Sequence, residues 1–336
     1  MIHSPYVREQ ASVHRVMRGV LLALLPGIAA YAWIVAAGIL VNLLIATVTA
    51  VLAEAFVLKL RKRPVAPAIT DLSAVVTAWL VVLCFPPILP WWVTVLAVLV
   101  AIVAVKHLYG GLGQNPFNPA MVAYCTMIIA YPSLMSQWPP AGGLDFATQL
   151  HLILGGARDI DAITGATALD AMRTGLRVAA GSVDTILQQD AFGLFGGRGW
   201  EWVAAGYLLG GMFLLVRRII TWHMPVAFVL ALASISGAFW IFNPAQFASP
   251  IFHLASGGAM LAAFFIVTDP VSGPITPRGK LIFAAGVGLL AFLIRSFGAF
   301  PEGIAFAVLL MNMCVPLIDM KTQPPVFGER KGGGAP

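Results

Sequence analysis

Long apolar runs alternate with short polar connections along almost the whole chain. Ten apolar segments fall near residues 16–34, 37–59, 70–87, 91–108, 119–137, 200–217, 221–241, 252–268, 280–298 and 302–320. Each is close to the roughly 20 residues that a helix needs to cross about 30 Å of hydrocarbon. The pattern therefore predicts an all-α integral membrane protein with about ten transmembrane helices.

Composition strengthens this prediction. Hydrophobic residues make up 60% of the 336 residues and charged residues only 10%, whereas soluble domains carry about 25% charged residues. The apolar sequence that follows the basic N-terminal flank continues well beyond the length of a signal peptide. We expect an uncleaved first span.

The net charge of +6 is explained by membrane topology rather than by nucleic-acid binding. With the N-terminus inside, the inner ends of the ten spans collect 15 of the 20 Lys and Arg residues, as the positive-inside rule requires. These are Arg8, Arg15, Arg18, Lys59, Arg61, Lys62, Arg63, Lys106, Arg217, Arg218, Arg278, Lys280, Lys321, Arg330 and Lys331. Both termini are therefore predicted to be cytoplasmic, and the polar stretch 138–198 between the fifth and sixth spans to be periplasmic.

The chain divides into four parts on this basis. They are a five-helix half (1–137), the periplasmic loop (138–198), a second five-helix half (199–320) and a disordered cytoplasmic tail (321–336). Asp71-Leu72-Ser73 and His253-Leu254-Ala255-Ser256 open similar series of spans in the two halves. Because five is odd, such halves would be inverted repeats, as in many transporters; two unrelated halves are the alternative.

The polar loop contains one conspicuous motif, Asp161-Ala162-Ile163-Thr164-Gly165-Ala166-Thr167. Its pattern should arise by chance in about one such chain in a thousand. Thr167 offers a hydroxyl nucleophile for a phosphoester, Gly165 and Ala166 leave its approach open, and Asp161 could orient a metal-assisted transfer. The alternative is structural, because Thr167-x-x-Asp170 also reads as a capping box that opens a helix at Ala168–Thr174.

A connector rich in Gly, Asn and Pro precedes the fifth span. Its prolines prevent helix continuation, and Asn115 and Asn118 offer the donors and acceptors that a heterocyclic ring edge requires. Irregular backbone at membrane depth is tolerated where it is packed in protein or lines a cavity. The alternative is that Asn118 only caps the fifth span.

Three acidic residues lie within or at the ends of spans, where ionised carboxylates are costly and often functional. Asp269, in Thr268-Asp269-Pro270, is the first candidate for an ion pathway; a turn cap or a pair with Arg278 is the alternative. Asp319 could instead pair with Lys321, and Glu54 could snorkel towards Lys59. The structural role is the favoured interpretation for each.

Cysteine and histidine patterns give no metal or haem site. Cys84, Cys125 and Cys314 are dispersed in apolar runs without a C-x-x-C motif, which predicts three buried thiols and no iron–sulfur cluster or zinc held by this chain alone. His107, His223 and His253 do not share a helix face at helical spacing, so axial haem ligation is not predicted.

The motif ending at Thr167, the Asn-Pro-Phe-Asn-Pro connector and the Thr-Asp-Pro break together resemble one family over nearly the whole chain. It is the family of the D subunit of Rnf ion-translocating electron-transport complexes and the B subunit of the sodium-pumping NADH:quinone reductase. The chain lacks the long N-terminal extension of the latter, and its Thr164 replaces a common Ser.

The resemblance implies a subunit of a bacterial inner-membrane pump that moves electrons between ferredoxin and NAD and couples this transfer to H⁺ or Na⁺ transport. It implies FMN attached by a flavin transferase through a phosphoester to Thr167, and a non-covalent riboflavin near Asn115 and Asn118. The expected partners are the other subunits of the complex, including one with its own flavin, and membrane lipid. An inverted-repeat solute channel or transporter without redox chemistry is the alternative function, and a structural anchor for redox partners is a third.

Overall fold

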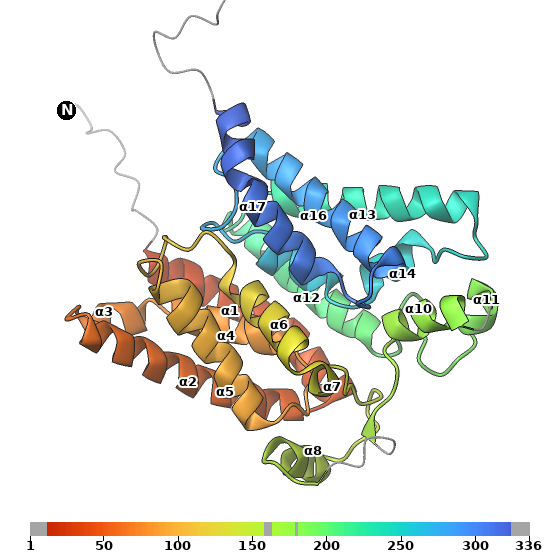
Figure 1. The fold of residues 1–336 in the computed structure, drawn as a ribbon, viewed down its shortest axis with the longest axis horizontal. Coiled ribbons are helices and arrows are strands. Elements are labelled where there is room, and N and C mark those ends of the chain that lie inside the picture. The colour runs from red at the N-terminus through yellow and green to blue at the C-terminus, as the bar shows by residue number, and fades with distance from the viewer. Residues whose placement is uncertain (1–11, 158–162, 179–180, 324–336) are drawn as a thin grey trace, which may run out of the picture.

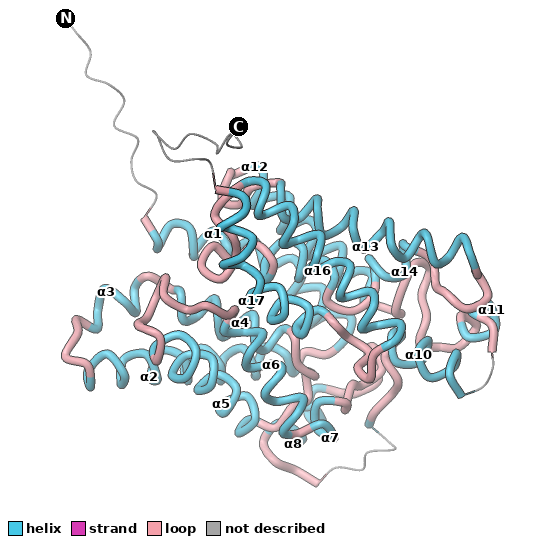
Figure 2. Tube along the Cα trace, turned by 45° about the horizontal axis from the view of Figure 1, so that its top comes forward, coloured by secondary structure: helices cyan, strands magenta, loops and turns pink. Residues whose placement is uncertain are grey.

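The computed structural model describes residues 12–157, 163–178 and 181–323, and these are mostly helical. Figure 2 shows helices joined by loops, and the described residues contain no strand beyond an isolated bridge between Phe192 and Gly197. The all-α prediction is confirmed for this part of the chain.

The N-terminal half begins with α1 (Val13–Ala30), which continues into the π-helical segment η1 (Tyr31–Val35). The helices that follow in this half are α2 (Gly38–Leu60), α3 (Val65–Thr70), α4 (Ser73–Leu83), α5 (Trp91–Leu99) with its π-helical continuation η2 (Val100–His107), α6 (Pro119–Ala130) and α7 (Pro132–Met135).

Three short helices lie in the described part of the polar stretch: α8 (Phe146–Ile153), α10 (Ala168–Val178) and α11 (Val183–Ile186). The C-terminal half contains α12 (Trp200–Val216), α13 (His223–Phe242), α14 (Pro250–Ala255), α15 (Ala259–Leu261) with the π-helical η3 (Ala262–Ile266), α16 (Pro277–Phe297) and α17 (Ile304–Thr322). Figure 1 shows the helices of each half grouped together, with α10 and α11 at the right, beneath α13 and α14, and α8 at the bottom.

Five stretches of helix are long and apolar enough to cross a membrane: Val13–Val35, Gly38–Leu60, His223–Phe242, Pro277–Phe297 and Ile304–Thr322. Four shorter apolar helices accompany them: Ser73–Leu83, Trp91–His107, Pro119–Ala130 and Trp200–Val216. The helical pattern and the number of long spans agree with a multi-pass membrane protein.

The boundaries of three predicted spans were wrong, each for a local reason. The segment predicted at 70–87 is helical only as α4, which ends ahead of Pro86 and Pro87. The segment at 119–137 is interrupted at Tyr131, between α6 and the short α7, because the residue before Pro132 is disfavoured in helical conformation. The segment at 252–268 is interrupted between α14 and α15, where Gly257 takes a φ of 62°.

The two halves meet where α1 crosses α12, and small residues make this approach possible. A Cβ on Gly210 would overlap the carbonyl oxygen of Ala23, and one on Gly206 would lie 2.7 Å from the Cα of Gly27. Without a hydrophobic driving force between helices in lipid, such close backbone contact is a principal source of helix association. The glycines of α12 therefore fix how the halves pack, and with them the cavities described next.

Candidate functional site

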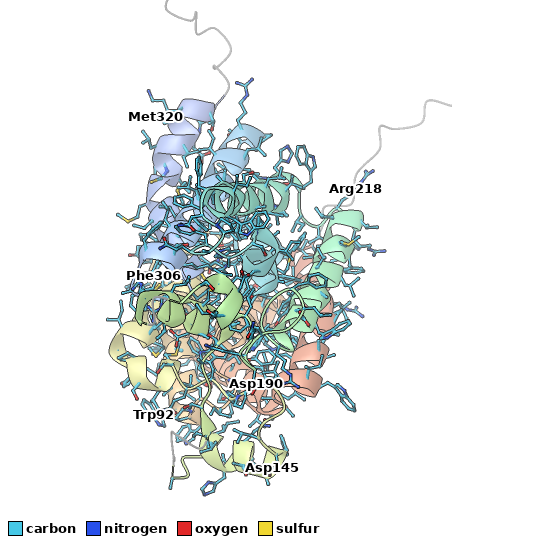
Figure 3. The ribbon with its side chains drawn as sticks, turned by 90° about the vertical axis from the view of Figure 1, so that its right-hand side faces the viewer. Trp92, Asp145, Asp190, Arg218, Phe306 and Met320 are labelled. Carbon is cyan, nitrogen blue, oxygen red and sulfur yellow. The ribbon has the colours of Figure 1, made fainter. Side chains whose placement is uncertain are left out.

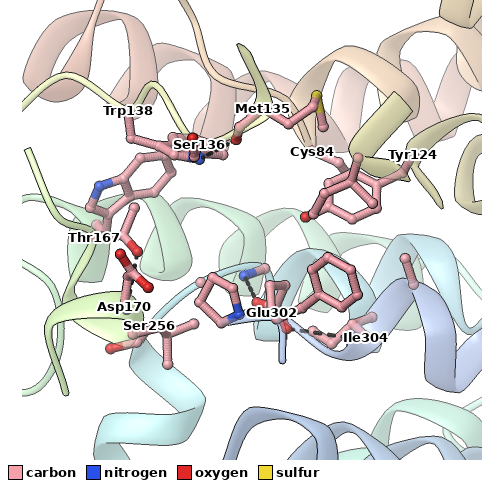
Figure 4. Close-up of a pocket in the computed structure, with 18 of the residues that line it drawn as sticks. Cys84, Tyr124, Met135, Ser136, Trp138, Thr167, Asp170, Ser256, Glu302 and Ile304 are labelled. Atoms are coloured by element: carbon pink, nitrogen blue, oxygen red, sulfur yellow. Dashed lines mark hydrogen bonds between the residues drawn. The ribbon is translucent and has the colours of Figure 1, made fainter. Parts of the chain in front are cut away.

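The larger of two cavities lies between the halves and is lined in part by the polar stretch. It has a volume of about 500 Å³ and is lined by residues of α6, α10, α12 and the turn between α16 and α17. In Figure 4, Thr167, Asp170 and Trp138 lie on one side, Cys84 and Tyr124 on the other, and Glu302 beneath. We call this space the Thr167 cavity. Its volume is within the 300–1,000 Å³ typical of small-molecule sites.

Thr167 stands immediately before α10 and is half-buried. Its Oγ1 accepts a hydrogen bond from the backbone N–H of Asp170 at 3.3 Å. The helix cap predicted from the sequence is therefore confirmed, although α10 runs on to Val178, beyond the expected end. In this bond Oγ1 of Thr167 is the acceptor and donates no proton. The helix cap therefore does not exclude a phosphoester at the same oxygen, which the sequence analysis expects.

The rest of the motif is described from Ile163 onwards, so Asp161 lies outside the described residues. Gly165 and Thr164 are half-buried and Ala166 is exposed. The N–H of Gly165 donates to the carbonyl oxygen of Trp138 at 2.8 Å. Trp138 and Gly165 both line the cavity, so this bond holds the motif against the rim and directs Thr167 towards the interior.

The wall of the Thr167 cavity suits a planar aromatic ring with a polar edge. Trp138 packs edge-on against Trp200 with ring centroids 5.5 Å apart, and both line the cavity. The hydroxyl oxygens of Tyr207 and Ser256 are buried, have no hydrogen-bond partner among the described residues, and also belong to the wall. Buried polar groups are normally satisfied, so these two hydroxyls fit hydrogen bonding to a ligand such as the isoalloxazine ring of FMN.

A buried ion pair reinforces the same wall and was not predicted. Arg295 and Glu302 are joined by hydrogen bonds of 3.1 Å from Nε and 2.9 Å from Nη2. Arg295 also donates to the carbonyl oxygen of His253, and Glu302 accepts from the N–H of Gly258. The pair thus bridges the interruption between α14 and α15. An Arg near the end of an apolar span was the only signal for it in the sequence.

The second cavity, of about 340 Å³, brings together residues that the sequence analysis considered separately. Asn115, Asn118 and Asp269 all line it, together with Lys106 and Lys280. We call it the Asn118 cavity. Its remaining wall is largely apolar, with side chains from α1, α4, α12 and η3.

Asn118 caps α6, as the structural alternative predicted. Its Oδ1 accepts from the N–H groups of Ala120 and Met121 at 3.0 and 3.3 Å, and its Nδ2 donates to the carbonyl oxygen of Ile266 at 3.3 Å. Its own N–H donates to Oδ1 of Asn312 at 3.1 Å. One N–H of the Asn118 amide is therefore still available to a ligand, while its oxygen is committed to the cap.

Asn115 and Asn312 complete this polar group. Nδ2 of Asn115 donates to the carbonyl oxygen of Phe117 at 2.9 Å, and Nδ2 of Asn312 donates to that of Ser272 at 2.9 Å. Asn312 was missed by the sequence analysis, although an asparagine in the middle of an apolar span is itself a signal for a buried polar contact. The connector, α17 and the turn after η3 are joined here.

The structure gives the three acidic residues different partners. Asp269 caps its turn, because its carboxylate accepts hydrogen bonds from the N–H groups of Val271 and Ser272. The turn cap given as an alternative is therefore confirmed. The ion pair with Arg278 is not found within the described residues. The expected pair of Asp319 with Lys321 is wrong, since Oδ1 of Asp319 accepts from the N–H of Ile275 at 3.1 Å.

The prediction that Glu54 snorkels towards Lys59 is also wrong. Glu54 is 2% exposed and pairs with Lys106, at 2.5 Å between Nζ and Oε1. The sequence placed Lys106 among the residues at the inner ends of the spans, yet it is 3% exposed. The expectation of three buried thiols was wrong for Cys314, which is exposed, while Cys125 is buried and Cys84 half-buried.

Comparisons with known proteins agree on one family. The model of the NQR2, RnfD, RnfE family matches residues 1–328. The chain is 48% identical over 345 residues to the D subunit of the ion-translocating oxidoreductase complex of Aliivibrio salmonicida, with 98% of each chain covered. It is 47% identical over 346 residues to the proteins of that name from Salmonella paratyphi A and Salmonella typhimurium, again over 98% of each chain.

Proposed function

From the premise that the chain belongs to the NQR2, RnfD, RnfE family, we propose that it is a membrane subunit of a redox-driven ion pump that carries FMN on Thr167. Its relatives are named as the D subunit of an ion-translocating oxidoreductase complex. We propose the corresponding role here: a ten-span subunit of a bacterial inner-membrane translocase of Rnf type, with electron transfer between ferredoxin and NAD coupled to H⁺ or Na⁺ transport.

The observation that carries the FMN proposal is the position of Thr167. Its side chain lines a cavity of about 500 Å³ whose wall contains paired tryptophans and two unpartnered buried hydroxyls. A flavin tethered there supplies one- and two-electron transfer. The chain's own part is to fix the phosphate at Thr167, to exclude water with Trp138 and Trp200, and to offer Tyr207 and Ser256 as hydrogen-bond partners.

Substitution of Thr167 tests this proposal directly. Thr167→Asn removes the hydroxyl nucleophile but leaves a residue that caps helices well. The chain should then lose the mass of FMN less one water and the flavin fluorescence that survives denaturing electrophoresis, while the subunit still folds. Asp161→Ala should reduce attachment by the flavin transferase. Thr164→Val, three residues upstream, should leave the bond intact.

The contrary result is equally clear. Fluorescence that persists in the denatured Thr167→Asn chain would mean that the flavin is attached to another residue, and Thr167 would keep only its role as the cap of α10. Because Asn retains the cap, a loss of fluorescence cannot be attributed to an unfolded helix.

A second, non-covalent flavin, riboflavin, is proposed for the Asn118 cavity. Its volume of about 340 Å³ is near the lower end of the range for small-molecule sites. Asn115 and Asn118 lie on its wall with one amide N–H of Asn118 available. Asp269 lies on the same wall and is proposed for the ion pathway, as are Glu54 and Asp319. A second flavin-bearing subunit of the complex is proposed to receive or supply the electrons.

A further inference from the structure

Four polar side chains from three helical segments meet in the interior of the N-terminal half. They are Glu54 of α2, Ser73 of α4, and Lys106 and His107 of η2, each no more than 5% exposed. Lys106 Nζ lies 2.5 Å from Oε1 of Glu54 and 2.7 Å from Oγ of Ser73. Nε2 of His107 is 3.4 Å from the same Glu54 oxygen. We call this group the Glu54 cluster.

The surroundings of the cluster leave it with few other charges. Nη1 of Arg61, which follows α2, donates to the carbonyl oxygen of His107 at 3.0 Å. Oδ1 of Asp71 accepts from the N–H of Ser73 at 2.7 Å. Nδ1 of His107 is buried and has no hydrogen-bond partner in the part of the chain that the structure describes. The cluster therefore holds two ionisable groups in an ion pair and a third, the imidazole, with unused hydrogen-bonding capacity.

The cluster opens onto the Asn118 cavity. Lys106 and Ser73 line that cavity, as do Asp269 and Lys280. Lys280 belongs to the basic residues that the positive-inside rule assigns to the cytoplasmic side. Lys106 thus contacts the buried Glu54 carboxylate and also lines the cavity to which Lys280 contributes.

A purely structural role explains this arrangement poorly. Desolvation makes a buried ion pair weak as a source of stability, and apolar residues of similar volume often serve as well or better. Ionisable groups inside membrane spans are costly, and they commonly mark ion or proton pathways. The members of the cluster come from three helical segments, α2, α4 and η2, that no local folding requirement brings together.

We propose that the Glu54 cluster is a proton-binding site of the ion-translocation path, an inference that rests on the translocase function proposed above. A negative charge that electron transfer brings into the Asn118 cavity draws the Lys106 ammonium away from Glu54. A hydronium ion in the cavity water then gives its proton to the unpaired carboxylate, which leaves water and the neutral acid. When Lys106 returns, the acid releases this proton to the neighbouring Nε2 of His107. The ion pair between Lys106 and Glu54 is then restored.

The geometry favours a proton over a sodium ion at this position. A cation next to Glu54 would have to share the carboxylate with the Lys106 ammonium, and two positive charges at such distances repel. Oε1 of Glu54 and Oγ of Ser73 both accept hydrogen bonds from the Lys106 ammonium, so the ammonium already engages the oxygens that a metal ion would need as ligands. Proton uptake requires only that Lys106 moves.

The test uses a double substitution that keeps the interior neutral. Glu54→Gln combined with Lys106→Met removes both charges, so no uncompensated charge is left buried. The complete complex, reconstituted in lipid vesicles, should keep its covalent FMN, but the number of protons taken up per transferred electron should fall. The fall should be the same with and without Na⁺. Lys59→Met, at an exposed charge on the same helix, is the matched control and should leave the proton-to-electron ratio unchanged.

An unchanged ratio in the double variant would overturn the proposal and leave the pair a structural one. An infrared difference spectrum of the wild-type complex, reduced minus oxidised, gives a readout that does not depend on variants. A protonated carboxyl band that shifts in D₂O should appear on reduction, and its absence overturns the proposal. Failure of the translocase function itself would be seen separately, as missing flavin in the wild-type subunit.

Discussion

Asn118 shows how one side chain can serve both the helix it begins and a distant part of the chain. Its oxygen caps α6, and its amide nitrogen binds the carbonyl oxygen of Ile266, 148 residues away. From Asn118 the polar contacts continue through Asn312 to Ser272, whose hydroxyl donates to Asp269 at 2.6 Å. The residues proposed for flavin binding and for ion movement are thus linked by hydrogen bonds at one wall of the Asn118 cavity.

Substitution of Asn118 should separate capping from flavin binding. Asn118→Ser keeps a good N-cap but removes the amide, so the subunit should fold and retain covalent FMN while its riboflavin content falls. Asn118→Leu removes both functions, and losing a satisfied buried hydrogen bond costs about 1–3 kcal/mol, so it should also lower stability. Extraction and quantification of non-covalent flavin measure the first effect. Normal riboflavin content in Asn118→Ser would leave the cap as the residue's role.

At the scale of elements, the crossing of α1 and α12 depends on glycines rather than on a polar contact. Gly206 and Gly210 are one helical turn apart and face the backbone of α1 at Gly27 and Ala23. Tyr207, between them, reaches the wall of the Thr167 cavity. The spacing that brings the two helices together therefore also sets the position of a hydroxyl proposed to face the flavin.

Gly210→Ala tests this packing. The added methyl group would overlap Ala23 backbone atoms that cannot move alone, and forced overpacking costs about 1–3 kcal/mol. The fraction of purified subunit that stays monodisperse after heating in detergent should fall relative to the wild type. Gly258→Ala is the matched control, because a Cβ there meets nothing within 4 Å and its φ of −89° suits any residue. Equal heat resistance of the two variants would contradict the close approach.

At the scale of the whole molecule, the hydrophobic pattern predicted the helices well but not the contacts between them. Each apolar run contains at least one helical segment, because periodicity and length report local burial. The sequence placed Glu54 near Lys59, one turn away, whereas the structure pairs it with Lys106 from another helix. The contacts of Asn312 and Arg295 were not predicted for the same reason. Their partners are distant in sequence, and the packing of the helices determines which residues these partners are. For the motif ending at Thr167, the helix cap was predictable because it is local.

The membrane orientation of the complete chain is the last prediction. Figure 3 shows Met320 and Arg218 towards one end of the molecule and Asp145, in the polar stretch, at the opposite end. Basic residues concentrate at the cytoplasmic ends of spans, so a reporter fused at Gly181 should report the periplasm and one fused at Gly328, outside the described residues, the cytoplasm. A matched fusion after Arg218 should also report the cytoplasm. A flavin transferase that works outside the membrane can reach Thr167 only in this orientation, so a cytoplasmic signal from the Gly181 fusion would contradict both the topology and the covalent FMN.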